Sequence, residues 1–201
     1  MEPGFVLRPP SGGVFRFDPG TLWLDLLVSG GPGDLAVFET LHAPADLATW
    51  AGQSRLRLDP GRVHVTAGEL ADLVRLRDGL WELAWALIRG RPVPPGIATL
   101  VDDAAAQPPL APRLQVTGSG FGREWTLPAT GTQLLSAVAR DVVDVLTGPH
   151  ADRVRECGGN RCGLVFLDTS RPGSRRWCSM ERCGNRSKVR ALRERRAPEP
   201  G

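Results

Sequence analysis

Apolar residues between positions 66 and 89 recur three and four residues apart, which is the spacing of one face of an α-helix. Thr66 precedes the run and Glu69 follows three residues later, the arrangement of a capping box, and Gly90 stands just beyond the end. We interpret the tryptophans that border this face as core residues rather than as a platform for stacking bases. The pattern predicts a long helix whose buried stripe consists of Leu70, Leu73, Val74, Leu76, Leu80, Leu83, Ala84 and Leu87, with Trp81 and Trp85 beside it.

Four shorter stretches also fit helices. Residues 44–50 carry proline in the first turn, where its missing N–H is tolerated, and residues 94–107 begin in the same way. Residues 130–146 place apolar side chains on one face and end before Gly-Pro. An apolar run at residues 22–27, with Thr21 as its N-cap, fits a short helix or, almost as well, a buried strand.

Alternation with a period of two residues predicts a small amount of strand. Residues 14–17 alternate in this way, whereas the rest of residues 1–20 is rich in Pro and Gly and is typical of loop. Residues 114–117 and 123–127 also alternate, and the Gly-rich segment 118–122 between them favours a β-hairpin.

These elements predict an α+β fold in which a mostly helical N-terminal domain with one β-hairpin occupies residues 1–150. Gly148-Pro149 marks the end of that domain, and residues 151–201 form a second, small one. Charge divides the chain at the same place. Residues 151–201 contain 13 basic and 6 acidic residues, a net of +7, whereas residues 1–150 contain 12 and 16, a net of −4.

All four cysteines lie in the C-terminal domain as two matched pairs, Cys157 with Cys162 and Cys178 with Cys183. Two close pairs joined by a short spacer can supply the four sulfurs of a tetrahedral zinc site. The alternatives are two disulfides or four buried thiols. We also expect the glycines that follow three of these cysteines to adopt positive φ within tight knuckles.

The segments between and after the cysteines predict a treble-clef-like module. Residues 164–167 fit a strand, residues 171–174 a turn and residues 175–177 the returning strand, followed by a helix from 178–180 to about residue 196. Zinc ligation contributes on the order of 10 kcal/mol to such small folds. One structural Zn²⁺ is therefore the expected cofactor.

Residues 166–171, 175–180 and 183–188 resemble the CGNR zinc finger, a family named for its last cysteine and the three residues that follow it. The resemblance implies that Cys157, Cys162, Cys178 and Cys183 are the zinc ligands and that the finger contacts DNA. In that family the finger usually closes a bacterial protein regarded as a stress-induced transcription regulator, whose N-terminal part is the ABATE domain.

The resemblance extends into residues 24–29, which match the first two positions of the ABATE signature Leu-Asp-Phe-x-Asn-Thr. Val28 replaces the Asn, so a role of that Asn, such as lining a ligand pocket, is not carried over to this sequence. Asp25 is interpreted as a residue of a packed helix whose carboxylate bonds neighbouring backbone.

The predicted C-terminal helix carries a line of arginines. Arg182, Arg186, Arg190 and Arg193 fall within about 80° of arc at about 100° per residue, and Val189 and Leu192 beside them are expected to pack toward Phe166 and Trp177. Such a line can follow phosphates, although a solvated helix face is the alternative. The predicted nucleic-acid contacts are Arg175, Arg176, Arg182, Arg186, Lys188, Arg190 and Arg193. Asn185 and Arg186 could instead be fixed within the finger by Asp168 and Ser170.

Other classes of function receive less support. The three histidines are scattered and every cysteine is assigned to zinc, so we expect no enzyme. The sequence lacks an 18-residue apolar run and a signal-peptide pattern, which predicts a cytoplasmic protein without a membrane span. We predict a DNA-binding transcription regulator whose N-terminal domain dimerises or senses a small-molecule effector. The rivals are a zinc-stabilised protein-interaction module and an RNA-binding protein.

Overall fold

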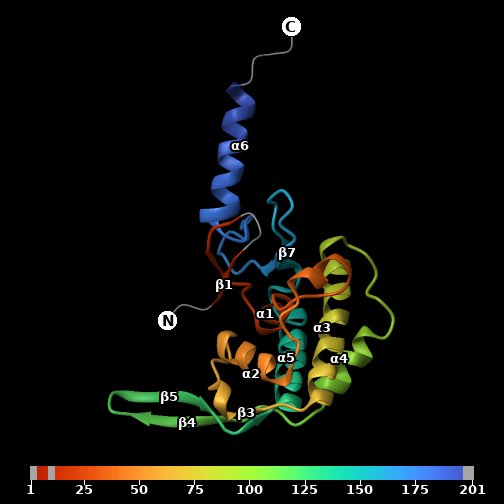
Figure 1. Ribbon diagram of the computed structural model, residues 1–201, viewed down its shortest axis with the longest axis vertical. Coiled ribbons are helices and arrows are strands. Elements are labelled where there is room, and N and C mark those ends of the chain that lie inside the picture. Colours follow the sequence, from red (N-terminus) through yellow and green to blue (C-terminus); the bar gives the residue numbers. More distant parts are fainter. Residues whose placement is uncertain (1–3, 9–11, 197–201) are drawn as a thin grey trace.

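A computed structural model describes residues 4–8 and 12–196 of the chain. Its helical body is built around two long helices that run parallel, and the C-terminal helix projects away from that body (Figure 1). The long helices are α3, Ala67–Ile88, and α5, Gly131–Leu146. Among the described residues, no helix combines the length and the apolar character needed to cross a membrane.

Capping boxes fix the start of both long helices. The side chain of Thr66 accepts from the backbone N–H of Glu69, and Thr130 accepts likewise from Gln133. The prediction for both helices is confirmed. Glu69 also joins them, because its Oε1 accepts from the backbone and hydroxyl of Thr132 at 2.8 and 2.9 Å.

The short helix α1, Leu22–Leu27, lies between the long helices and is buried at every position, which confirms a helix rather than a strand. Asp25 accepts from the backbone N–H of Arg55 at 2.9 Å, as expected of a carboxylate bonded to backbone, and also from its guanidinium. Burial raises the pKa of Asp25 to about 6 even though Arg55 opposes the shift.

Smaller helices cover this core. They are α2, Pro44–Gln53, and α4, Ile97–Ala105, together with 3₁₀ turns at Gly33–Phe38 (η1), Pro60–Arg62 (η2) and Ala151–Arg153 (η3). Helix α4 begins later than residue 94 because the backbone of Gly96 takes the left-handed φ of 81°.

Four two-stranded sheets complete the described fold. Strand β1, Phe5–Leu7, pairs antiparallel with β2, Phe15–Phe17, so the predicted strand near residues 14–17 has a partner that the sequence pattern did not reveal. Strand β4, Pro112–Thr117, pairs with β5, Gly120–Trp125, as an exposed hairpin with a tighter turn than predicted. Val63–His64 (β3) and Ala129–Thr130 (β6) pair in parallel.

The strand pairing predicted for the C-terminal module is wrong. Strand β8, Val165–Leu167, pairs antiparallel with β7, Val154–Glu156, and residues 175–177 form no strand. The backbone of residues 175–177 instead serves the cysteine knuckles, since the carbonyl of Arg176 accepts from the N–H of Gly158 at 2.9 Å.

Each of the two hydrophobic cores contains side chains from both the N-terminal and the C-terminal part of the chain. Val154, Val165 and Leu167 of the β7–β8 hairpin are buried in the main helical core. Conversely, Phe15 and Phe17 of β2 are buried against Phe166 and the cysteines Cys157, Cys178 and Cys183. Between these two sets the N–H of Leu167 donates to the carbonyl of Pro19 at 2.7 Å. The N-terminal hairpin therefore packs on the cysteine module.

Candidate functional site

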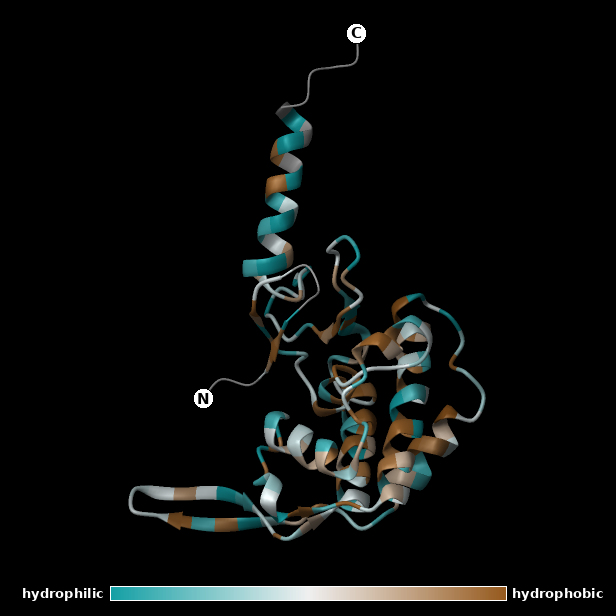
Figure 2. Ribbon diagram, in the orientation of Figure 1, coloured by the Kyte–Doolittle hydropathy of each residue, from teal (hydrophilic) through white to brown (hydrophobic). Residues whose placement is uncertain are grey.

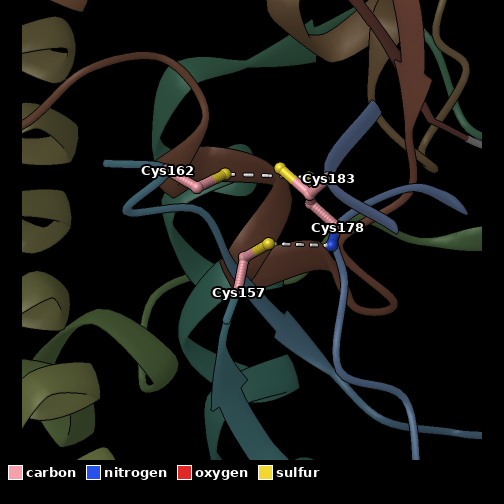
Figure 3. A group of neighbouring side chains, drawn as sticks. All are labelled: Cys157, Cys162, Cys178 and Cys183. Carbon is pink, nitrogen blue, oxygen red and sulfur yellow. Dashed lines mark hydrogen bonds between the residues drawn. The ribbon is translucent and has the colours of Figure 1, made fainter. Parts of the chain in front are cut away.

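The four cysteines converge on one point from three segments of chain (Figure 3). Their sulfur atoms all lie within 4.8 Å of one another, and none forms a disulfide. The Sγ atoms of Cys162 and Cys178 are 3.7 Å apart. A tetrahedral Zn–S₄ centre with bonds of about 2.3 Å places its sulfurs about 3.8 Å apart. The donor set and its spacing therefore fit zinc.

Local backbone structure sets these positions. Cys157 follows β7, and its N–H donates to the carbonyl of Leu164 at 2.8 Å, which closes the first knuckle. Cys178 lies just before Ser179, the N-cap of a π-helical turn (η4) at Met180–Gly184, and Cys183 lies within that turn. Helix α6, Asn185–Arg196, continues directly from it. The predicted helix is confirmed and carries Cys183 in its first turn, whereas Cys178 lies just before the N-cap rather than on the helix.

The surroundings favour ionised sulfur at Cys157. Hydrogen bonds from the thiols of Cys162 and Cys178, together with backbone N–H groups, lower the pKa of Cys157, with the N–H of Cys178 only 3.1 Å from its Sγ. The hydrogen bond to ionised Cys157 raises the pKa of Cys162 in turn. Four thiolates in this volume need a cation, which a bound Zn²⁺ supplies.

The glycines of the module play different parts from those predicted. Of the three that follow a ligand, Gly163 has positive φ, 66°, whereas Gly158 and Gly184 do not. Arg161 takes a left-handed φ of 54° within the first knuckle. Gly159 is required for close approach, because a Cβ there would lie 2.6 Å from the Sγ of Cys183.

Arg175 is held inside the module, although the sequence placed it among the nucleic-acid contacts. Its Nη2 donates to the carbonyls of Asp18 and Cys178 at 3.0 and 2.9 Å, and its guanidinium carbon lies 4.1 Å from the centre of the Phe166 ring. The buried carboxylate of Asp168 accepts from the N–H of Arg175 at 2.8 Å and from Ser170. Asp168 thus orders the loop before Cys178 rather than Asn185 or Arg186.

The arginines of the predicted line do share one side of the C-terminal segment. Arg182, Arg186, Arg190 and Arg193 all line one groove beside the β1–β2 hairpin. Arg182 lies in η4, and its guanidinium carbon is 4.6 Å from the centre of the Phe15 ring. The other three lie on α6, which is largely hydrophilic (Figure 2).

The packing predicted for α6 is wrong. Val189 and Leu192 are 47% and 43% exposed and do not bury themselves against Phe166 and Trp177. Phe166 is covered instead by Arg175 and by the phenylalanines of β2. The hairpin takes the place that the sequence pattern assigned to the helix.

Family comparisons agree with this geometry. The CGNR zinc finger model matches residues 153–196, which hold the four cysteines. The ABATE model, described as "Putative stress-induced transcription regulator", matches residues 20–149, more than half of the chain. The chain belongs to the ABATE family. No curated protein matches the sequence.

The cysteine cluster and the finger match together establish one structural zinc ion, held by Cys157, Cys162, Cys178 and Cys183. In this ABATE protein zinc supplies the centre that fixes the two knuckles and the start of α6. Four thiolates complete a tetrahedral structural site.

Two features of the structure were not predicted from the sequence: a buried ion pair in the ABATE domain and a cavity beside it. Arg77 is 2% exposed and forms a bidentate pair with Glu39, with N–O distances of 2.8 and 2.7 Å. Arg77 lies four residues after Leu73 and three before Leu80, on the buried stripe of α3. This spacing is the signal in the sequence that could have identified it as buried. The second feature is a cavity of about 760 Å³ between this domain and the finger.

Proposed function

We propose that this ABATE protein is a DNA-binding transcription regulator of the bacterial cytoplasm and that α6 is its DNA-contacting element. The observation that carries the proposal is the position of α6, which projects from the body with its N-terminal end fixed by the zinc finger (Figure 1). Its exposed charged side chains are all basic among those described. They are Arg186, Lys188, Arg190, Arg193 and Arg195.

The dimensions of α6 suit a DNA groove. A helix of 12 residues is about 18 Å long, and the major groove, about 12 Å wide, admits an α-helix. Arginine can pair with phosphate or bond guanine in a bidentate fashion. Exposed Arg176, stacked 5.2 Å from the ring centre of Trp177, adds charge near the base of the helix. Arg175 is not included, because its Nε and Nη2 donate to the carbonyls of Trp177, Cys178 and Asp18.

We propose a structural rather than a catalytic role for the zinc centre. Hydrolytic zinc sites keep one coordination position for water, whereas four cysteines fill all four. We infer that the ABATE domain then supplies sensing or dimerisation.

The salt dependence of DNA binding tests this proposal. Roughly five phosphate contacts, from Arg176, Arg186, Lys188, Arg190 and Arg193, predict a slope of about −4 to −5 for log affinity against log salt. Changing Arg190 and Arg193 to Ala should flatten that slope by about two units without loss of zinc. Fluorescence anisotropy with labelled duplex DNA measures both.

The matched control removes two exposed arginines from the ABATE domain, Arg91 and Arg113. This double Ala variant has the same net charge as the α6 variant, so an unchanged slope would assign the effect to α6 rather than to total charge. If the wild-type protein binds DNA no better than about 10 µM even at low salt, the regulator proposal is wrong.

A protein-docking module is the second candidate. It is favoured by the exposed apolar side chains of Met180, Val189 and Leu192, which lie among the charges of the C-terminal segment. A protein partner would cover these side chains, and its binding would change little with salt.

A further inference from the structure

A cavity of about 760 Å³ separates the helical body from the zinc finger. Its volume lies within the range of sites that bind small molecules, roughly 300–1,000 Å³. The ABATE domain, the β1–β2 hairpin, the first knuckle and the start of α6 all contribute lining residues.

The wall from the ABATE domain is apolar. Leu27, Val28, Leu35, Phe38 and Trp81 line it. Trp81 has no donor left for a ligand, since its Nε1 donates to the carbonyl of Gly30 at 2.8 Å. This surface offers hydrophobic contact.

Hydrogen bonds fix the segment that follows η1, which carries Leu35 and Phe38 of this wall. Glu39, directly after Phe38, pairs with buried Arg77 of α3, and its Oε1 also accepts from the N–H of Leu41 at 2.9 Å. The hydroxyl of Thr40 donates to the carbonyl of Ser29 at 3.0 Å. The apolar wall is therefore preformed, which lowers the entropic cost of binding.

The charged side chains that line the cavity are all basic among the described residues. They are Arg8, directly after β1, and Arg161, Arg182, Arg186 and Arg190 of the C-terminal module. Cys162 and Cys183 also border the space, and a zinc ion with four thiolates carries a net charge of −2. Five guanidinium groups outweigh that charge, so the cavity is electropositive.

One of these arginines has an unsatisfied donor. The Nε of Arg182 is buried, and no hydrogen-bond acceptor reaches it in the described part of the chain. An orphaned donor of this kind is destabilising, and more so when it is charged. The guanidinium of Arg182, which lines the cavity, thus has bonding capacity that the described residues do not use.

We infer that this cavity binds a small amphipathic anion, a carboxylate or phosphate attached to an apolar group. The apolar part lies against Leu35, Phe38 and Trp81, and the anionic head lies among the arginines of the finger. The pairing follows from charge complementarity, because apolar residues of the ABATE domain and basic residues, most of them in the finger, line the same space.

Such a ligand would also regulate α6, and this extension rests on the proposed function. Arg186 and Arg190 line the cavity and belong to the basic surface of α6. A bound anion that engages them leaves fewer guanidinium groups for phosphate, so ligand and DNA oppose each other's binding reciprocally.

Calorimetric titration of the zinc-loaded full chain tests the cavity without DNA. The probes are octanoate, octyl phosphate and uncharged 1-octanol, which share one apolar chain. We expect at least one of the anions to bind about tenfold or more tightly than octanol, since hydrogen bonds to charged groups are worth about 1.5–3 kcal/mol. Binding of octanoate alone identifies a carboxylate site, and binding of octyl phosphate alone identifies a phosphate site.

Variants locate the binding. The double variant Arg161→Gln/Arg186→Gln should bind the anions about tenfold or more weakly. The charge-matched control is Lys188→Gln/Arg193→Gln. These two residues do not line the cavity, so the affinity for the anions should stay unchanged. Leu35→Trp fills the apolar part of the cavity and should lower the affinity for all three probes. Zinc content and the thermal transition confirm that each variant is folded.

Three results would overturn the inference: no heat of binding up to about 10 mM of either anion, octanol binding as tightly as both anions, or unchanged affinity in the Arg161/Arg186 variant. In the DNA arm, the better anion should weaken DNA binding by the wild type and not by that variant. Absence of any DNA binding counts against the regulator proposal alone, because calorimetry still decides the cavity.

Discussion

At the scale of single residues, the pair formed by Arg77 and Glu39 shows how a charged group can belong to a core. Burial acts to raise the pKa of Glu39, but hydrogen bonds from Arg77 and two backbone amides hold it below the usual value. Asp78 accepts from Nε and Nη2 of the guanidinium at 3.1 and 3.0 Å, and the hydroxyl of Ser29 accepts from Nη1 at 3.4 Å. Every donor direction of Arg77 is used, which is the condition under which a buried charge is tolerated.

Replacing Arg77 with Leu should lower the stability of the protein by about 3–5 kcal/mol, because Glu39 loses its countercharge in a confined place. The thermal midpoint should fall by about 10 °C, measured by circular dichroism at neutral pH. Arg75→Leu is the matched control on the same helix. Arg75 pairs with Asp72 at the surface, so its loss should cost less than about 1 kcal/mol. Equal effects of the two changes would contradict the structural role of Arg77.

The zinc ligands could be predicted residue by residue, whereas the contacts of Arg175 and Asp168 could not. Cysteine chemistry restricts four spaced thiols in a basic segment to few arrangements. An arginine side chain can bind phosphate or donate to backbone carbonyls. For Arg175 the second use is decided by the carbonyls of Asp18 and Cys178, which the fold brings next to it. Those contacts join residues 157 positions apart in one case, beyond the reach of local pattern.

At the scale of elements, the amphipathic helices were predicted well because their caps and periodicity are local. The bounds of α3 and α5 follow from Thr66 and Thr130, each of which carries its own hydrogen-bonding signal. Strand β7 and the surroundings of α6 were missed for the opposite reason. A three-residue strand has too short a pattern to identify its partner, and the partner of β8 lies before the cysteines rather than after them.

The exposure of α6 predicts a contrast between two apolar side chains that the sequence placed together. Phe166→Ala should cost about 3–5 kcal/mol, since the side chain is fully buried beside the cysteines. Val189→Ala should change stability by no more than about 0.5 kcal/mol. Urea unfolding followed by circular dichroism measures both. A cost above about 2 kcal/mol for Val189 would mean that α6 packs against the finger after all.

At the scale of the whole molecule, the two family matches meet near residue 150, but each of the two hydrophobic cores contains residues from both sides of that boundary. Val165 and Leu167 of the finger belong to the helical core, whereas Phe15 and Phe17 from the N-terminal hairpin belong to the cysteine core. Loss of the zinc centre should therefore affect both ends of the chain.

Cys178→Ser, or removal of zinc by a chelator, should abolish amide protection in residues 157–196 and also in the β1–β2 hairpin. Helices α3 and α5 should keep their protection, because they are buried mainly against each other, α1 and α4. Hydrogen exchange with mass spectrometry resolves these segments, and elemental analysis of the untreated protein should give one zinc per chain. Protection retained in β1–β2 after metal loss would show that the hairpin does not depend on the finger. Loss in α3 as well would show that the chain unfolds as one unit.

The position of Phe15 and Phe17 has a consequence for how such proteins arise. A recombination event that moved only the last fifty codons into another gene would carry the four cysteines and α6 but leave behind two aromatic side chains of the metal module's core. The recipient would have to supply equivalent aromatic residues from elsewhere in its own chain. In this protein the beginning and the end of the gene must therefore evolve together.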